Sequence, residues 1–248
     1  MEVKNNSEGT KSRIEYSGYY IVKSANLKET AGDELDNEIS VLMDLRKKRF
    51  KYHAKIIDAE FGNYIKMEYI EGELLANLLK FKIKTISEEK RNNITESIAL
   101  TLIEFYKTGY YHNDLAASNI IIKKDTQEAY LIDFGRAKTY GSLEKDLGYF
   151  LSNILKVRFK GNFLVNILVY SIKCTFFLKI YFNMFEHIEK NERNKMFLKI
   201  LKEFYLFEIY IIKNRDFTKV TKLKIILLIF PTIMLCIIKY FKKSLIKK

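Results

Sequence analysis

Cysteine and histidine are scarce in this sequence of 248 residues, which contains two cysteines and three histidines. Cys174 and Cys236 both lie in apolar stretches, so we expect buried thiols in a reducing compartment and no disulfide framework. His53 and His187 lack the spacing of metal ligands, and we expect packing or surface roles for them. These absences argue against a disulfide scaffold and against a histidine-based metal protein.

Acidic residues are scarce in one part of the chain only. Residues 1–150 contain 23 basic and 24 acidic side chains, whereas residues 151–248 contain 20 basic and 6 acidic ones. The excess behind the net charge of +13 therefore lies wholly in the second part, which predicts an anionic partner there. Nucleic acid is not the expected partner, because these lysines flank long aliphatic runs and arginine is scarce among them.

Two short motifs carry the strongest chemical signal. The segment 112–119 reads H-N-D-L-A-A-S-N, and D-F-G follows at 133–135. Between them, the apolar residues 120–122 and 130–132 flank a polar stretch, which predicts a β-hairpin. Such a hairpin would place the two motifs side by side at one end of its strands.

These motifs resemble the protein-kinase signature H-x-D-L-x-x-x-N plus D-F-G. The resemblance implies that Asp114 accepts the proton of the acceptor hydroxyl. It also implies that Asn119 and Asp133 hold Mg²⁺, or alternatively Mn²⁺, on the phosphates of ATP. His112 is expected to brace this loop. Two other interpretations stay open: a polar turn in an unrelated fold, and a pseudokinase that binds nucleotide without turnover.

Candidates for holding ATP lie upstream. Residues 19–23 alternate like a β-strand and end in Lys23, which resembles the lysine of the kinase V-A-I-K strand and would bind the α and β phosphates. A helix is predicted over 32–49, with Glu38 as the expected partner of Lys23 and Glu34, one turn earlier, as the fallback. The alternative for Glu38 is a solvated helix glutamate.

The phosphate-covering loop and the adenine site are fainter signals. Gly9 and Ser12 could offer backbone N–H groups to a phosphate, although protein kinases carry three glycines there and a polar N-terminus without this role is the alternative. The segment 67–72 resembles the link between kinase lobes. This resemblance makes Met67 the gatekeeper and assigns the adenine edge to the backbone of Glu68 and Ile70, whereas an ordinary strand and turn is the alternative.

The segments 68–72, 109–114, 131–135 and 145–149 together resemble the bacterial lipopolysaccharide core sugar (heptose or Kdo) kinases, with RIO-type atypical kinases as the second match. The resemblance implies an α+β, protein-kinase-like fold of two lobes with ATP between them. We expect a small β-rich lobe over residues 1–70, a mainly helical lobe over 71–215 and a basic apolar helix over 216–248.

Departures from ordinary protein kinases bear on the acceptor. Position 113 is Asn113 where most protein kinases have arginine, so regulation by phosphorylation of the activation loop is not expected. No A-P-E motif follows, and only ten residues separate Gly135 from Asp146, which resembles the aspartate that anchors the catalytic loop. The short segment favours a compact acceptor such as a sugar of a lipid-linked glycan, with a protein acceptor of a RIO-like kinase as the alternative.

The segment 225–238 is uncharged and flanked by lysines. As a helix it would span roughly 21 Å, which is short of a bilayer core of about 30 Å. We therefore expect it to lie on an anionic membrane surface, with packing against the helical lobe and a transmembrane anchor as alternatives. Because the first ten residues are polar and predict no signal peptide, the enzyme is expected to be cytoplasmic and peripheral on the cytoplasmic face of the membrane.

Overall fold

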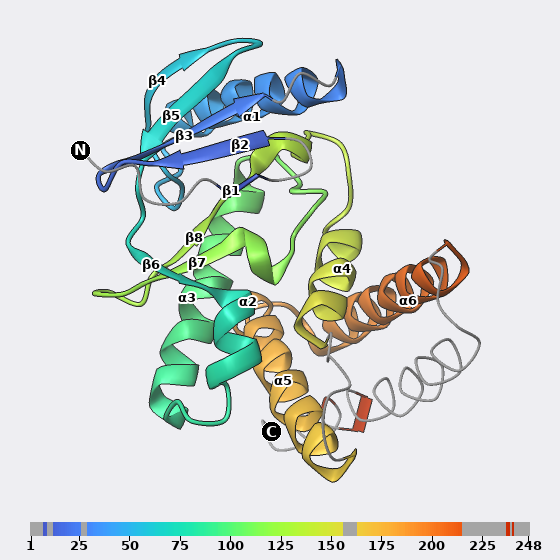
Figure 1. Ribbon diagram of the computed structural model, residues 1–248. Helices are drawn as coiled ribbons and strands as arrows, with labels where there is room; N and C mark the ends of the chain where they lie inside the picture. Colours follow the sequence, from blue (N-terminus) through green and yellow to red (C-terminus); the bar gives the residue numbers. More distant parts are fainter. Residues whose placement is uncertain are drawn as a thin grey trace.

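The computed structural model describes residues 7–8, 12–25, 29–155, 163–214, 237–238 and 240. Its first part is an antiparallel five-stranded sheet in the order β1-β2-β3-β5-β4, with helix α1 beside it (Figure 1). The elements are β1 (Ser7–Glu8), β2 (Ser12–Tyr16), β3 (Tyr20–Ala25), α1 (Glu29–Lys47), β4 (Ile56–Glu60) and β5 (Tyr64–Glu68). This part matches the small β-rich lobe that the sequence predicts.

Helix α1 was predicted over 32–49 and spans Glu29–Lys47. Leu35, Ile39 and Leu42 recur at helical spacing and are all buried, so they form one apolar stripe. The helix contacts strands β3, β4 and β5, where Ile65 is also buried. Burial of this stripe sets the rotation of the helix and therefore decides which of its polar residues face the rest of the molecule.

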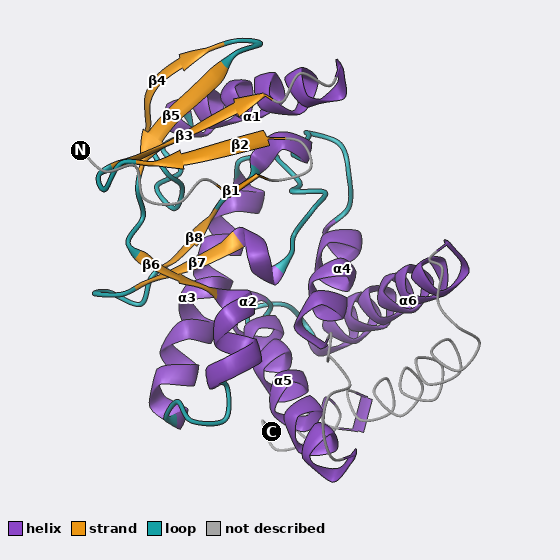
Figure 2. Cartoon of the chain, viewed as in Figure 1, coloured by secondary structure: helices purple, strands orange, loops and turns teal. Residues whose placement is uncertain are grey.

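A second, three-stranded antiparallel sheet lies between the first sheet and the helices (Figure 2). It consists of β6 (Gly72–Leu74), β7 (Ile120–Lys123) and β8 (Ala129–Leu131). Strands β7 and β8 are the predicted hairpin, with Ile120 opposite Leu131. Glycine is required in β6, because a Cβ atom on Gly72 would lie 2.5 Å from the backbone oxygen of Ile122.

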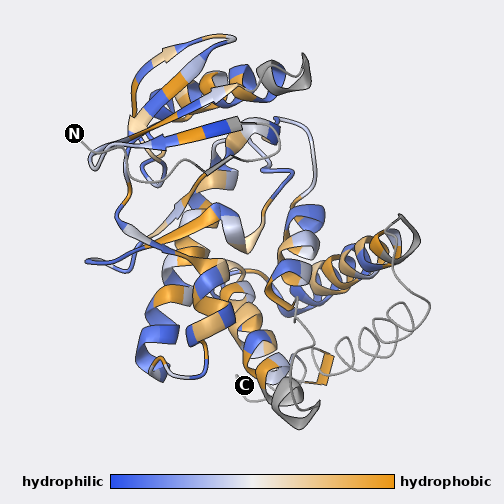
Figure 3. Ribbon diagram, in the orientation of Figure 1, coloured by the Kyte–Doolittle hydropathy of each residue, from blue (hydrophilic) through white to orange (hydrophobic). Residues whose placement is uncertain are grey.

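The rest of the described chain is mainly helical. It contains α2 (Leu75–Asn77), a π-helical turn (Leu78–Lys82), α3 (Glu88–Lys107), α4 (Leu143–Leu155), α5 (Phe163–Met184) and α6 (Lys190–Asn214). Helix α3 begins after Ser87, whose hydroxyl oxygen accepts the backbone N–H of Lys90. Figure 3 shows apolar residues along α5, where Phe176, Phe177 and Tyr181 are buried.

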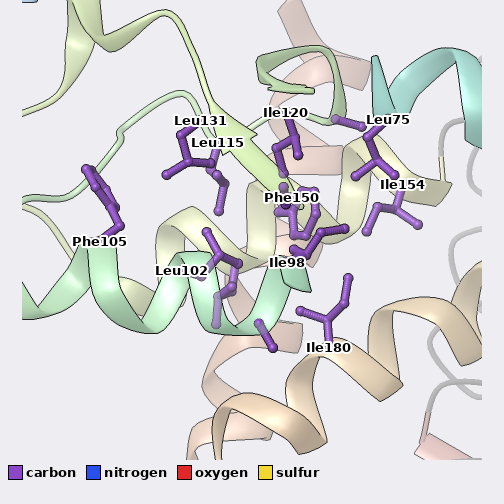
Figure 4. Close-up of a cluster of buried hydrophobic side chains, with 14 of the residues drawn as sticks. Leu75, Ile98, Leu102, Phe105, Leu115, Ile120, Leu131, Phe150, Ile154 and Ile180 are labelled. Carbon is purple, nitrogen blue, oxygen red and sulfur yellow. The ribbon is translucent and has the colours of Figure 1, made fainter. Parts of the chain in front are cut away.

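The core of the helical part reaches up to the second sheet. Figure 4 shows buried side chains of α3 and α4 that meet Ile120 and Leu131 of the hairpin, with Ile180 of α5 below them. A continuous core of this kind makes the hairpin a rigid platform for the residues at its ends. The predicted fold class, an α+β two-lobed kinase-like fold, is confirmed.

Most of the predicted C-terminal helix over 216–248 lies outside the described residues. Tyr240 is described and buried, and its ring stacks on Phe197 of α6 at 4.0 Å between centroids. Its hydroxyl donates a hydrogen bond of 2.6 Å to Asn194. Within the described part of the chain, no helix is long and apolar enough to cross a membrane.

Candidate active site

Lys23 on β3 lies between two carboxylates. Its ammonium nitrogen is 2.6 Å from Glu38 Oε2 and 2.8 Å from Asp133 Oδ1. Glu38 is buried on α1, and its second oxygen accepts the backbone N–H of Phe134 at 3.2 Å. Glu34, the fallback partner, instead lies 3.3 Å from Arg136. The structure therefore brings together Lys23 and Glu38, the first choice of the sequence, and adds Asp133 to the pair.

The three charges shift one another's pKa values. Burial alone lowers the pKa of Lys23, but the negative charges of Glu38 and Asp133 outweigh it and raise that pKa. Burial raises the pKa of Glu38, and the ammonium of Lys23 opposes that shift. For Asp133, burial acts upward, but the charge and hydrogen bond of Lys23 outweigh it and lower the pKa. Lys23 and Asp133 are therefore both charged at neutral pH.

Asn119 and Asp133 lie at the same end of the hairpin, as predicted. The backbone N–H of Ile132 donates to the Asn119 carbonyl at 3.0 Å, so the backbone pairing of β7 and β8 continues as far as the residue before Asp133. The Asn119 amide donates to the Asp114 carbonyl at 2.9 Å, which orients its own side-chain oxygen away from that bond. Asp133 has a left-handed φ of 63°, a conformation that is uncommon outside glycine and typical of functional turns.

The loop that carries Asp114 is held from below by Asp146 on α4. This buried carboxylate accepts the backbone N–H groups of His112 at 2.8 Å and Asn113 at 2.9 Å. The His112 ring donates from Nε2 to the Ile132 carbonyl at 3.2 Å and lies against Phe134. His112 therefore braces the loop, and Asp146 anchors it from the next helix, as the sequence predicts for both.

A cavity of about 600 Å³ opens between the two sheets. Asp114, Asn119 and Asp133 line one side of it, together with Lys23 and Glu38. Met67, Glu68 and Ile70 line it at the link between the lobes, where the sequence places the adenine site. Of the two residues expected to cover phosphates, Gly9 lies outside the described residues and Ser12 is described for its backbone only.

The protein kinase domain family matches residues 11–164, which is more than half of the chain. The chain belongs to the protein kinase family. The two predicted motifs, the lysine strand and the helix with Glu38 all fall within the matched residues.

Three relatives of this kinase illustrate the range of the family. Serine/threonine-protein kinase ppk11 of Schizosaccharomyces pombe is 32% identical over 125 residues, which cover 49% of this chain and 39% of ppk11. Dual specificity protein kinase zakA of Dictyostelium discoideum is 36% identical over 101 residues, 40% of this chain and 13% of zakA. KEOPS complex subunit Bud32 of Pyrococcus abyssi is 27% identical over 158 residues, 57% of this chain and 69% of Bud32.

The chain thus spans well under half the length of ppk11 and zakA and about two thirds of Bud32. By name, ppk11 and zakA are protein kinases and Bud32 is a subunit of the KEOPS complex, and none of the three is named for a sugar acceptor. The resemblance to lipopolysaccharide core kinases gains no support from them.

Sequence reasoning missed two residues of the kinase site. Arg136 follows the D-F-G motif directly, and its guanidinium lies 3.6 Å from Asp114 and 3.3 Å from Glu34. Asn37 precedes Glu38 on α1 and contacts the backbone after Asp133. Adjacency to a motif residue was the available signal for both, but contacts across 100 residues of sequence are not visible in a local pattern.

Proposed function

We propose that this kinase is a compact atypical serine/threonine protein kinase, which transfers the γ-phosphate of ATP to a protein hydroxyl. The observation that carries the proposal is the convergence of Lys23, Asp133 and Asp114 on one cavity, with Glu38 as a buried partner of the lysine. The names of ppk11 and zakA support a protein acceptor, and Bud32 offers a compact relative of which the aligned part covers most.

The roles of the side chains follow from their charges and places. Lys23 would hold the phosphates of ATP, because it stays protonated and lines the cavity beside Asp133. Asp114 would accept the proton of the acceptor hydroxyl, since its carboxylate also lines the cavity. Met67 and the backbone of Glu68 and Ile70 would contact adenine from the link between the lobes.

The residues present fit a divalent cation. Asp133 offers a carboxylate. Asn119 offers its side-chain oxygen, because its hydrogen bond to the Asp114 carbonyl is made by the side-chain nitrogen. Hard cations such as Mg²⁺ take oxygen ligands and commonly bind through one or two side chains plus substrate phosphates. When bound, such an ion neutralises phosphate charge during transfer. Among the described residues no cluster of three or more His, Cys, Asp or Glu side chains forms a metal site without ATP.

The acceptor is proposed to be protein although the segment after D-F-G is short. Helix α4 begins at Leu143, so only residues 137–142 separate it from the 3₁₀ turn Phe134–Arg136. That length, which favoured a sugar acceptor in the sequence, suits a RIO-like protein kinase equally well. The proposed membrane partner depends on residues 216–248, most of which lie outside the described residues, and the cytoplasmic location remains a proposal.

The test is transfer from γ-labelled ATP with Mg²⁺ by the full chain, with casein as a generic protein acceptor and a glycolipid extract of the source cells in parallel. We expect label in protein, reduced at least about a hundredfold in Asp114→Asn, as expected for loss of a general base. Asp125→Asn is the matched control, because Asp125 is an exposed carboxylate on the turn between β7 and β8.

The other outcomes assign the kinase differently. Label that appears only in the lipid fraction and depends on Asp114 would establish a glycolipid kinase and refute the protein acceptor. Bound ATP without transfer to either fraction would identify a pseudokinase.

A further inference from the structure

Asn37 of α1 makes several hydrogen bonds to the segment after Asp133. The Asn37 amide nitrogen donates to the backbone carbonyls of Phe134 at 3.3 Å, Gly135 at 3.0 Å and Ala137 at 3.0 Å. The Asn37 side-chain oxygen in turn accepts a hydrogen bond of 3.0 Å from the ammonium of Lys138. One carboxamide therefore contacts three backbone carbonyls and one side chain within residues 134–138.

The same segment is fixed on its other side by the catalytic loop. Tyr111 and Lys138 exchange two backbone hydrogen bonds, of 2.8 and 3.0 Å. The Asn113 amide, which stands where most protein kinases have arginine, faces the carbonyls of Arg136 and Tyr140 at 3.4 Å. The segment is thus clamped between α1 and the loop that carries Asp114.

The clamp leaves little room between the segment and α1. A Cβ atom added to Gly135 would lie 3.1 Å from the Glu34 backbone oxygen, closer than ordinary van der Waals contact. Arg136 can therefore reach both Glu34 and Asp114, at 3.3 and 3.6 Å. Any rotation of α1 that separated Asn37 from the segment would also pull Glu38 away from Lys23 and from the Phe134 N–H.

We propose that Asn37 is the positioning residue that locks α1 against the D-F-G segment and thereby keeps Lys23, Asp133 and Asp114 in their catalytic arrangement. The lock consists of neutral amide–carbonyl hydrogen bonds within the chain, so it needs no phosphorylated side chain. The proposal concerns the alignment of these catalytic side chains and is independent of which acceptor the kinase uses.

The test is Asn37→Asp in the full chain, with Mg²⁺-dependent ATP hydrolysis and Mg·ADP binding as readouts. Aspartate keeps the size and the acceptor for Lys138 but removes both N–H donors and places a negative charge against the three carbonyls. We expect kcat to fall at least tenfold while the dissociation constant of Mg·ADP changes less than threefold. Hydrogen exchange should rise in residues 134–138 and stay unchanged in α3.

Asn63→Asp is the matched control, because Asn63 is exposed on the turn between β4 and β5, its amide donates to Glu60, and it does not line the cavity. This variant should keep kcat within twofold of the parent. The proposal is overturned if Asn37→Asp also stays within twofold, if Asn63→Asp loses as much, or if the loss comes with faster exchange throughout the chain. Because hydrolysis needs no protein or lipid acceptor, failure here is distinguishable from failure of the proposed function.

Discussion

Removal of the Lys23 ammonium should lower both the unfolding free energy of the kinase and its rate of phosphoryl transfer, and a second change should restore only the unfolding free energy. Lys23→Met leaves Glu38, of which 2% is exposed, without its partner at 2.6 Å and beside the carboxylate of Asp133. Breaking a buried ion pair by removing one partner costs about 3–5 kcal/mol. We expect the lower end, about 3 kcal/mol, because Asp133 is half-exposed and its charge is screened by water.

The loss should depend on pH. Burial and the Asp133 charge both raise the pKa of Glu38, and the variant lacks the ammonium that opposes them. A carboxyl whose folded pKa is raised contributes stability below its unfolded pKa and loses it as pH rises through the folded value. Lys23→Met should therefore be close to the parent near pH 4 to 5 and fall below it toward pH 7.

The second change is Glu38→Gln, which removes the charge and keeps a side-chain oxygen for the Phe134 N–H. The double variant Lys23→Met/Glu38→Gln should regain about 2 kcal/mol over Lys23→Met at pH 7. Its rate of phosphoryl transfer should stay at least about a hundredfold below that of the parent, because the Lys23 ammonium that would bind the phosphates is still missing.

Urea unfolding at pH 5 and pH 7, with transfer from labelled ATP in parallel, measures both quantities. The reasoning is refuted if Lys23→Met is as stable as the parent at pH 7, or if the double variant is less stable than Lys23→Met. Recovery of transfer in the double variant would refute the role of Lys23.

Two further predictions concern residues away from the ion pair. Asp146→Ala removes the acceptor of the His112 and Asn113 N–H groups, so we expect about 2 kcal/mol less unfolding free energy and at least tenfold slower transfer, measured by urea unfolding and by initial rates; unchanged rates would show that the anchor is not needed. Lys173 is buried on α5, and burial lowers its pKa to about 8. A depressed lysine pKa makes the parent gain stability between pH 8 and about pH 10, so the unfolding free energy of the parent should rise relative to that of Lys173→Met between pH 7 and pH 10; a difference that stays constant over this range would contradict it.

Local pattern was enough for the elements that carry the site. The alternation of residues 19–23 and the apolar spacing of α1 predicted a strand and a helix, and both are present with shifted ends. The two runs around the polar turn predicted the hairpin of β7 and β8, and a hairpin necessarily brings its ends together. These predictions succeeded because they depend on neighbours within a few residues, where backbone periodicity decides the outcome.

Local pattern ranked Glu38 ahead of Glu34 on α1 but did not exclude Glu34. Glu34 and Glu38 are one turn apart and so share one face of the helix. Which of them pairs with Lys23 depends on how deeply each side chain is buried between α1 and the rest of the kinase. Glu38 lies over the buried end of Lys23, whereas Glu34 lies farther out and meets Arg136.

By itself, the sequence determined the protein-kinase family, the two-lobed α+β fold and the candidates Lys23, Asp114, Asn119 and Asp133, because each of these belongs to a short motif. Only the tertiary structure showed that Asp133 also pairs with Lys23, and only it decided the ion pairs of Arg136 and the hydrogen bonds of Asn37. These contacts join residues up to about 100 positions apart, and their geometry follows from how the apolar stripe of α1 packs on the first sheet. Residue types in short motifs therefore identified the site residues, whereas packing set the positions of their side chains relative to one another.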